Sequence, residues 1–411
     1  GAHTGVWRTR ARMHKLRTAK QLVGPELGIT ALGFRAWFEA RQGREAYAAL
    51  DRIPRLAWAD YLDWFRGFVG IGVRHGTRLL SVSPLEGGAV TGLRLTLEVN
   101  GQQRSETTRK LVLANGIAGN GAPIVPAWLQ PLRSAGLAAH TADTIDFAAL
   151  AGRRVAVIGA AASAFDAAAT ALEAGAAALH LFVRRDGIAA RAVAKPRAYP
   201  GFYDNHHALP DALRWQHALR HRRAGSTPPA DALQRVLLHK DSFHLHLNAA
   251  WSDARAEGGQ VVTTVQGQTF AFDFVIAGTG YSSDPSQRAE LAMIAPQIAR
   301  WRDRYTPPPG DDDDALAASP YLGAGLEYQA RTPGTAPWLG AIHVFNPAGF
   351  TSAGGPLGDV PSMRRDVPAA VRRISQDLFL EDLDLHATRA QAEVAPDFGP
   401  ELYARAVWQP G

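Results

Sequence analysis

Cysteine is absent from the 411 residues of this chain. The absence excludes zinc–thiolate sites, thiol nucleophiles, cysteine-bound iron–sulfur clusters and redox-active disulfides. Any redox chemistry must therefore come from a bound cofactor. Lysine is scarce as well, with 5 residues against 39 arginines, an imbalance typical of GC-rich bacterial genomes.

Long apolar runs and concentrated charge are also missing. No stretch approaches the roughly 18 consecutive apolar residues of a membrane span, and no secretory segment is visible, so we expect a cytoplasmic protein. The net charge is +6, but the basic residues are scattered, which argues against nucleic-acid binding. With 46% hydrophobic residues, the chain is typical of a globular protein of about two or three domains. Its oligomeric state stays open.

The spacing of apolar residues predicts where helices and strands lie. They recur every three or four positions over 26–70, which predicts helices. Alternation over 73–99 predicts strands, and the following Asn100-Gly101 favours a hairpin turn. We expect a short buried strand at 110–114. A loop-rich tail from 300 ends in a helix near 366–380.

A βαβ unit is predicted over residues 153–185. Strands at 154–158 and 179–183 flank a helix at 163–174, and Gly175 stands where helix ends favour glycine. A basic helical region at 208–240 and strands at 261–265 and 270–277 follow.

The turn of this unit resembles a dinucleotide cradle. Such a cradle needs a glycine for the tight turn, a second where backbone approaches the pyrophosphate, and a small residue for helix packing. Gly159, Ser163 and Ala164 fit these needs, whereas Ala161 stands where the second glycine is usual. The helix N-terminus would face the phosphates. The alternative is a structural unit whose small residues serve packing alone.

Arg184 and Arg185 follow the second strand of the unit. An acidic residue here would bind the ribose of NAD, whereas an arginine suits a 2′-phosphate. The pair therefore favours NADPH as the nucleotide.

Two further strands run into glycines, at Ala114-Asn115-Gly116 and at Gly278-Thr279-Gly280. Backbone can approach a ligand closely at such junctions. Taken singly, each is also consistent with an ordinary turn.

Other polar groups are weaker candidates. His244 and His246 share a strand face but lack a third metal ligand, so we expect a structural role and no metal site. His206-His207 is expected in a surface loop. The acidic run 311–314 lacks the glycine and glutamate of a calcium loop. A solvated helix face that could attract NADPH is expected for four arginines: Arg214, Arg220, Arg222 and Arg223.

Several short motifs occur in a characteristic order along the chain. They are Gly5-Val6-Trp7, His140-Thr141, Ser163-Ala164-Phe165-Asp166, Gly278-Thr279-Gly280-Tyr281 and Asn346-Pro347-Ala348-Gly349. This set resembles the flavin-containing and Baeyer–Villiger-type monooxygenases, which have two dinucleotide-binding domains. In that family the corresponding motifs are a Gly-x-Trp loop, a His-Ser pair, Ser-Ala-x-Asp, an Ala-Thr-Gly-Tyr return and a loop that closes over the flavin.

The resemblance implies an α/β fold with two Rossmann-like domains. The FAD-type domain would be discontinuous, at 1–150 and 280–411, and the NAD(P)-binding domain would be inserted at 151–279. The family's first βαβ segment, with its glycine motif for FAD, has no counterpart in the sequence, so we expect a truncated FAD domain. This absence and Ala161 leave open a remnant or binding protein that keeps the fold without its cofactors.

The resemblance also implies a reaction and a set of cofactor-binding residues. NADPH would reduce FAD, the reduced flavin would react with dioxygen, and oxygen would pass to a small-molecule substrate. No catalytic acid or base is implied. A flavin-free NADP dehydrogenase that uses only 153–185 is a further alternative, without a Tyr-x-x-x-Lys proton donor set. The residues implied to border the flavin are Gly5, Trp7, Ala114, Gly116 and Gly280, with His14 and Asn115 bonding its ring or ribityl chain.

Overall fold

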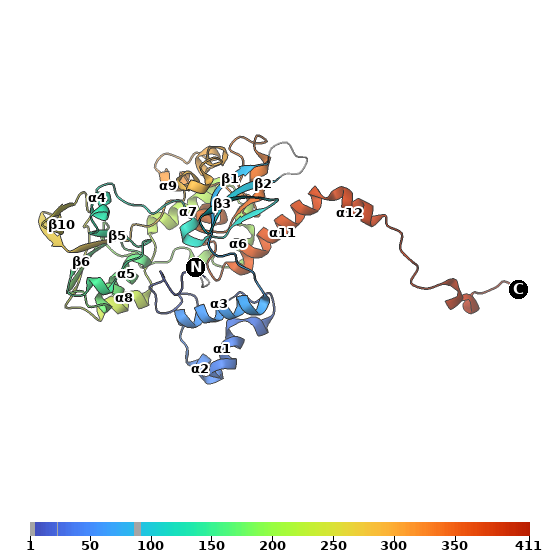
Figure 1. Cartoon of the computed structure of the whole chain (residues 1–411), viewed down its shortest axis with the longest axis horizontal. Helices are drawn as coiled ribbons and strands as arrows, with labels where there is room; N and C mark the ends of the chain where they lie inside the picture. Colours follow the sequence, from blue (N-terminus) through green and yellow to red (C-terminus); the bar gives the residue numbers. More distant parts are fainter. Residues whose placement is uncertain (1–4, 23, 86–91) are drawn as a thin grey trace.

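The computed structural model describes residues 5–22, 24–85 and 92–411. Figure 1 shows a lobe around a parallel sheet, a helical lobe from the N-terminal third, and a third region where β1–β3 lie near α11. The helices are α1 Phe34–Gln42, α2 Arg44–Ala49, α3 Arg55–Val69, α4 Leu129–Ser134, α5 Ala162–Glu173, α6 Pro200–Asn205, α7 Asp211–Ala224, α8 Ala230–Leu237, α9 Asp314–Ala317, α10 Phe350–Ala353, α11 Met363–Glu381 and α12 Leu383–Ala390. The strands are β1 Thr77–Pro84, β2 Leu93–Val99, β3 Gln102–Thr108, β4 Leu111–Leu113, β5 Ala138–His140, β6 Arg154–Ile158, β7 Ala178–Phe182, β8 Phe243–His246, β9 Arg255–Glu257, β10 Gln260–Val265, β11 Gln268–Phe272, β12 Phe274–Ala277 and β13 Ile342–Val344.

A five-stranded parallel sheet, in the order β5-β12-β6-β7-β8, forms the largest sheet of the described chain. Alternate residues of β6 face opposite sides. Val155 and Val157 pack under α5 and α8, whereas Ala156 joins a core with β10 and β11 on the other side. Because both faces are covered, the central strands β6 and β12 are nearly continuous apolar runs. The βαβ prediction is confirmed.

The expected strand at 270–277 is wrong in one respect, because the chain divides there into β11 and β12. Asp273 separates them. Its carboxylate accepts hydrogen bonds from the Arg154 amide (2.7 Å) and the Gln260 side chain (2.8 Å). These bonds hold the bend that sends β11 into an antiparallel sheet with β10 and β12 into the parallel one.

The hairpin at Asn100-Gly101 is confirmed, since it joins the antiparallel strands β2 and β3. Asn100 and Gly101 have φ values of +51° and +83°. Hairpin turns of type I′ require positive φ at both central positions, which asparagine and glycine accept most readily.

The strands β4 and β13 form a separate parallel pair. Leu113 is buried as the sequence predicts, but Val112 is 44% exposed, so β4 is only partly buried. The strand has one paired edge and one covered face in the described structure, which explains why its middle side chain meets solvent.

Helices α1–α3 confirm the aromatic periodicity of the N-terminal region. Phe34, Trp37, Trp58 and Tyr61 are buried together. The Tyr61 hydroxyl donates to the Leu32 carbonyl (2.9 Å). This cluster fixes the helical lobe that hangs below the rest of the molecule in Figure 1.

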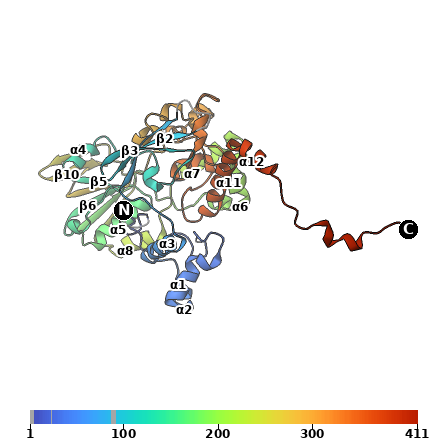
Figure 2. The same cartoon turned by 45° about the vertical axis from the view of Figure 1, so that its right-hand side comes forward.

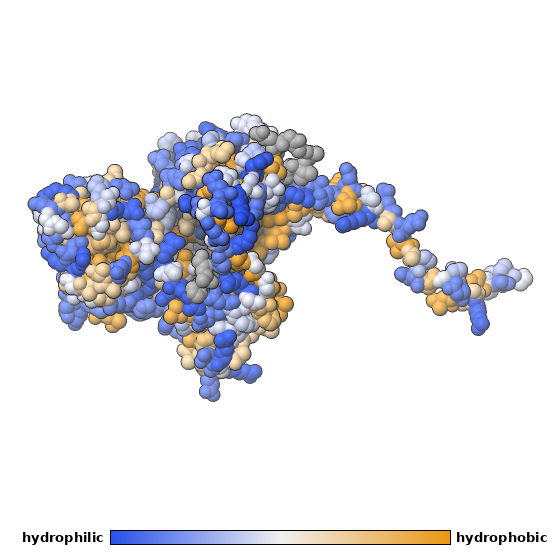
Figure 3. All heavy atoms as spheres, viewed as in Figure 1, coloured by the Kyte–Doolittle hydropathy of each residue, from blue (hydrophilic) through white to orange (hydrophobic). Residues whose placement is uncertain are grey.

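At the C-terminus, α11 and α12 run outward and the chain continues away from the body (Figures 1 and 2). Hydrophobic residues lie along this tail in Figure 3. Three side chains of the tail, Phe398, Leu402 and Trp408, are 60–80% exposed. None of the described helices combines the length and apolar character that a bilayer span demands.

Arg214 and His206 are buried against expectation, whereas Arg220, Arg222, Arg223 and His207 are exposed as expected. Arg214 is only 1% exposed, because its guanidinium donates to Asp211 (2.9 Å) and to the Ser352 carbonyl (3.1 Å). His206 is likewise buried. The acidic run 311–314 pairs with α7, since the ion pairs Arg222–Asp313 (2.5 Å) and Arg223–Asp311 (2.9 Å) join them.

Histidines of β7 and β8 form a cluster that includes a residue the sequence did not single out. His180 Nδ1 lies 2.9 Å from His246 Nε2, and the His180 and His244 rings are 4.5 Å apart. Burial and the neighbouring imidazoles lower the pKa of His180 to about 4. Among the described residues, no group of His, Cys, Asp or Glu is arranged to hold a metal ion.

This cluster makes stability depend on pH. Because the folded pKa of His180 lies near 4, below the unfolded value of about 6.5, the folded state resists protonation. Its contribution is complete above pH 6.5 and is lost as the pH falls toward 4. We expect the free energy of unfolding to fall by at most about 1.4 kcal/mol for each pH unit in this range. The fall is smaller where water screens the ring. Urea unfolding at pH 7, 6 and 5 should show a shallower decline for His180→Phe. Parallel declines would contradict this assignment.

Candidate functional site

The turn between β6 and α5 is closed so tightly that only glycine fits. Gly159 has a φ of +136°, and a Cβ atom there would lie 2.4 Å from the Gly278 carbonyl oxygen. A Cβ on Gly278 would in turn lie 2.8 Å from Ala164 Cβ. The ends of β6 and β12 and the first turn of α5 therefore meet at one point. Gly278, placed by sequence at a second junction, belongs to this turn.

The N-terminus of α5 opens at the carboxyl end of β6. Ala161 is extended and its carbonyl accepts from the amides of Ala164 (3.1 Å) and Phe165 (3.2 Å). The earlier amides, at Ala162 and Ser163, have no intrahelical acceptor, and the helix dipole adds positive potential. This geometry fits a pyrophosphate, with the methyl group of Ala161 at the usual position of a second glycine.

The two arginines after β7 have different surroundings. Arg185 donates to the carbonyls of Arg223 (2.9 Å) and Arg222 (3.3 Å), so it caps the C-terminus of α7. Arg184 is exposed and makes no side-chain hydrogen bond or ion pair within the described structure. We propose that Arg184, rather than Arg185, meets the 2′-phosphate of NADPH.

Substitution of these arginines separates the two roles. Arg184→Ala should weaken NADP⁺ binding about 10- to 100-fold and leave NAD⁺ binding unchanged. A loss of this size corresponds to the free energy of one charge-assisted hydrogen bond. Arg185→Ala is the matched control and should lower the melting temperature while keeping the NADP⁺ preference. Fluorescence titration with both nucleotides measures the effect. An equal loss for NADP⁺ and NAD⁺ in Arg184→Ala would refute the assignment.

An arginine-rich segment, residues 6–17, lies against the parallel-sheet lobe. Arg12 donates to the Thr141 carbonyl (2.9 Å), and burial lowers its pKa. Arg17 pairs with Asp166 (2.5 Å), which is 5% exposed. Arg235 of α8 reaches both Asp166 (3.5 Å) and the Arg12 carbonyl (3.2 Å). Asp166 thus fastens this segment to α5, a role its motif did not reveal.

His14 lies in the same region, with Nε2 3.4 Å from Glu173 on α5. It lines a cavity of about 600 Å³ beside Arg17 and Arg235. Its expected contact with flavin stays a prediction.

Several residues expected near flavin meet at the carboxyl ends of β4 and β13. Asn346 Nδ2 donates to Asn115 Oδ1 (3.1 Å) and to the Leu113 carbonyl (3.2 Å). Gly116 follows at a φ of +61°, next to Ala114 and Asn115. Two motifs more than 200 residues apart in sequence thus share one sheet edge.

Trp7 and Gly280 are held by other contacts. Trp7 packs edge-on against Trp58, with ring centroids 6.4 Å apart, in a cluster that also contacts Val360 before α11. Gly5, two residues earlier, has a φ of +69°. The Gly280 carbonyl accepts from the Ile124 amide (3.0 Å). Their flavin contacts stay predictions.

The described residues fit the two expected nucleotides unequally. The β6–α5 turn has the tight glycine turn and the free helix amides that a nucleotide pyrophosphate needs, with Ala161 in place of the second glycine. Within residues 5–22, 24–85 and 92–411, no second glycine turn between a strand and a helix offers the same cradle for the pyrophosphate of FAD. What these residues offer FAD is the Asn115–Asn346 edge.

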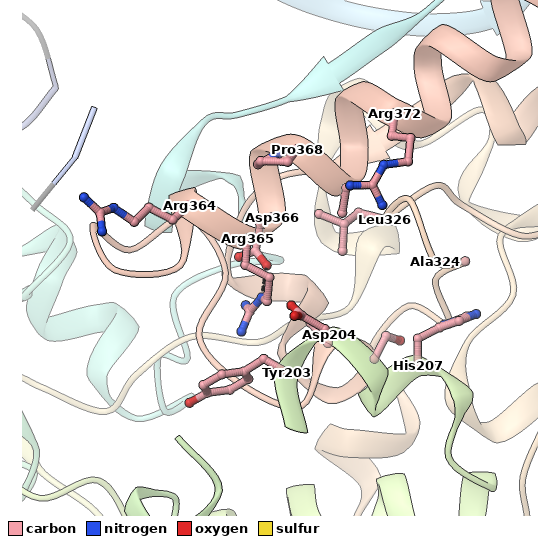
Figure 4. A pocket seen from close by; sticks show the side chains of 14 residues that line it. Tyr203, Asp204, His207, Ala324, Leu326, Arg364, Arg365, Asp366, Pro368 and Arg372 are labelled. Carbon is pink, nitrogen blue, oxygen red and sulfur yellow. Dashed lines mark hydrogen bonds and ion pairs between the residues drawn. The ribbon is translucent and has the colours of Figure 1, made fainter. Parts of the chain in front are cut away.

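A cavity of about 420 Å³ lies between α6 and α11 (Figure 4). Tyr203 and Asp204 of α6 face Arg365 and Asp366 of α11 across it, and Arg372 lies beside Leu326. No sequence motif marks this site, because its residues come from segments far apart in the chain.

Comparisons with known proteins show which family this chain belongs to. Residues 46–283 match the family model of L-lysine 6-monooxygenase/L-ornithine 5-monooxygenase. The FAD-dependent urate hydroxylase of Xanthomonas campestris pv. campestris is 37% identical over 378 residues, covering 92% of this chain and 79% of the relative. The chain belongs to this monooxygenase family.

Solved structures agree on the fold. The ornithine N-hydroxylase of Kutzneria sp. 744 is similar with a TM-score of 0.71 at 15% identity, covering 92% of this chain and 91% of that one. The ornithine hydroxylase PvdA from Pseudomonas aeruginosa gives 0.68 at 16% identity, covering 90% and 88%. The expected α/β fold and the resemblance to flavin monooxygenases are confirmed. FAD and NADPH, expected from the sequence, are the cofactors of this family.

Proposed function

We propose that this NADPH- and FAD-dependent monooxygenase hydroxylates a small oxopurine of the urate class. The observation that carries the proposal is the 37% identity to a urate hydroxylase over 92% of the chain. The mixed cationic and anionic lining of the α6–α11 cavity supports it, because an oxopurine presents both oxo groups and N–H groups. The expected partners, dioxygen and a small-molecule substrate, follow from this reaction class.

The chain's own residues divide the work. The β6–α5 turn binds the NADPH pyrophosphate, and Arg184 selects the 2′-phosphate. Asn115 and Asn346 orient the flavin side of the site. When bound, the cofactors would supply the redox chemistry, namely a hydride from NADPH and the activation of dioxygen by flavin, while these residues hold them in place. We keep the division into a discontinuous FAD-type domain (1–150 and 280–411) and an inserted NADPH domain (151–279) as part of this proposal.

A second candidate is hydroxylation of the side-chain amine of lysine or ornithine. The family model that matches residues 46–283 favours it. An amino acid would place its ammonium and carboxylate groups against opposite charges, which the same cavity also provides.

Two measurements on the purified protein test the proposal. A flavin spectrum, present as isolated or after reconstitution with FAD, is expected, together with NADPH oxidation that urate accelerates. Acceleration by L-lysine or L-ornithine but not by urate would favour the second candidate. A colourless protein that FAD cannot reconstitute would overturn both. NADPH binding would then indicate a flavin-free dehydrogenase, and its absence a remnant without cofactors.

A further inference from the structure

The cavity between α6 and α11 contains a buried carboxylate oxygen without a partner. Asp366 is 4% exposed, and its Oδ1 accepts from Arg365 Nε. Its Oδ2 has no hydrogen-bond partner among the described residues. The nearby Ser362 hydroxyl donates to the Asp359 carbonyl (3.1 Å), and it also lies close enough to Asp366 to favour the charged form of that carboxyl. An unsatisfied buried acceptor costs about 1–3 kcal/mol, which an N–H donor from a ligand would offset.

A cation without a partner lies on the same helix. Arg365 and Arg372, seven residues apart on α11, both line the cavity and therefore share a helix face. Arg372 makes no hydrogen bond or ion pair within the described structure, whereas Arg364 pairs with Glu26 and Arg373 with Asp377. A guanidinium group is suited to bind an oxo or anionic oxygen with two parallel hydrogen bonds.

One wall of the cavity near these groups is formed by a guanidinium lying over an aromatic ring. The Arg365 guanidinium lies 4.4 Å from the centroid of the Tyr203 ring. Gly355 packs so closely on that ring that a Cβ atom would lie 2.7 Å from it. Ring, guanidinium and glycine backbone thus fix one another. A planar ligand can lie along such a wall with little loss of conformational entropy.

We propose that this cavity is the substrate site and that it binds a planar oxopurine anion. A ring N–H donates to Asp366 Oδ2, and an oxo group accepts from Arg372. The inference rests on the proposed function and extends it to named residues. An amino acid has a flexible aliphatic chain, which the Tyr203–Arg365 wall does not select.

The site forms only when distant segments meet. Tyr203 and His207 come from the region before α7, Leu326 from a loop, and Asp366 and Arg372 from α11. Arg214, buried beneath, joins Asp211 of α7 to the Ser352 carbonyl of α10, and Ser352 lines the cavity. The bonds of Arg214 therefore fix the position of α10, which carries Ser352, relative to α7.

Arg372→Ala tests the proposal, because Arg372 is exposed and its loss should spare the fold. Equilibrium dialysis with labelled urate should show an affinity 10- to 100-fold weaker than that of the wild type, with NADP⁺ affinity unchanged. Arg372→Lys should be intermediate, since it keeps the charge but loses the two parallel bonds. Arg389→Ala, an exposed arginine of α12, is the control and should bind urate normally.

Steady-state kinetics separate this inference from the proposed function. Arg372→Ala should raise the KM for urate by a similar factor and leave the KM for NADPH unchanged. If wild type oxidises NADPH in response to urate and Arg372→Ala keeps both its KM and its affinity, the site assignment is overturned while the proposed function stands. If Arg372→Ala instead loses binding of L-ornithine, the oxopurine class is overturned.

Discussion

Gly159→Ala is expected to weaken NADP⁺ binding at least about tenfold, or 1.4 kcal/mol. The new Cβ atom would lie 2.4 Å from the Gly278 carbonyl oxygen, and the φ of +136° is one that alanine rarely adopts. The Gly278 oxygen cannot yield easily, because it belongs to the backbone directly after β12. The turn must therefore shift, and the amides of α5 move away from the pyrophosphate. Fluorescence titration measures the change.

The matched control for this substitution is Gly187→Ala. Gly187 follows the end of β7, has no positive φ, and a Cβ atom there would meet nothing within 4 Å. Its NADP⁺ affinity and melting temperature should equal those of the wild type. Circular dichroism on both variants distinguishes a displaced turn from an unfolded protein. An unchanged affinity in Gly159→Ala would show that this turn does not bind the nucleotide.

Local patterns were enough to predict the βαβ unit and the β2–β3 hairpin. The apolar run of β6 and the alanines of α5 are contiguous in sequence, and their packing follows from helix and strand periodicity. The hairpin turn at Asn100-Gly101 is also predictable from local sequence, because it depends only on the φ values of two residues.

Long-range ion pairs escaped prediction. The acidic run 311–314 is about 90 residues from the α7 arginines that it pairs with. Arg214 is buried because Asp211 and Ser352 satisfy it, and no helical periodicity predicts such a partner. The same holds for His180, whose partners come from the neighbouring strand β8. A charged residue is assigned to the surface by default, and only tertiary contacts can reverse that assignment.

The sequence predicts the nucleotide cradle but not the α6–α11 cavity. The nucleotide cradle needs particular residues at fixed spacing, so the positions of Gly159 and Ser163 are enough to indicate it. The α6–α11 cavity has no such rule. Asp366 and Arg372 sit in a helix whose sequence pattern indicates only amphipathic packing, and their significance comes from a missing partner, which only coordinates can show.

Asp166→Asn is expected to lower the free energy of unfolding by about 3 kcal/mol, the lower range for breaking a buried ion pair. Asp166 is 5% exposed and accepts from Arg17 and Arg235, of which Arg235 is itself 8% exposed. Asparagine keeps the shape and removes the charge, so the largely buried Arg235 loses one of its two acidic partners. The 40% exposure of the Arg17 side chain keeps the loss from being larger.

Glu257→Gln provides the comparison, because its pair with Arg255 is exposed on both sides, at 60% and 66%. Glu257→Gln should lower the free energy of unfolding by less than about 1 kcal/mol. Urea unfolding of both variants measures the contrast. If Asp166→Asn costs no more than Glu257→Gln, the arginine-rich segment is not fastened through Asp166. A loss confined to Asp166→Asn, accompanied by faster proteolysis within residues 6–17, would show that this carboxylate holds the segment against the nucleotide-binding helix.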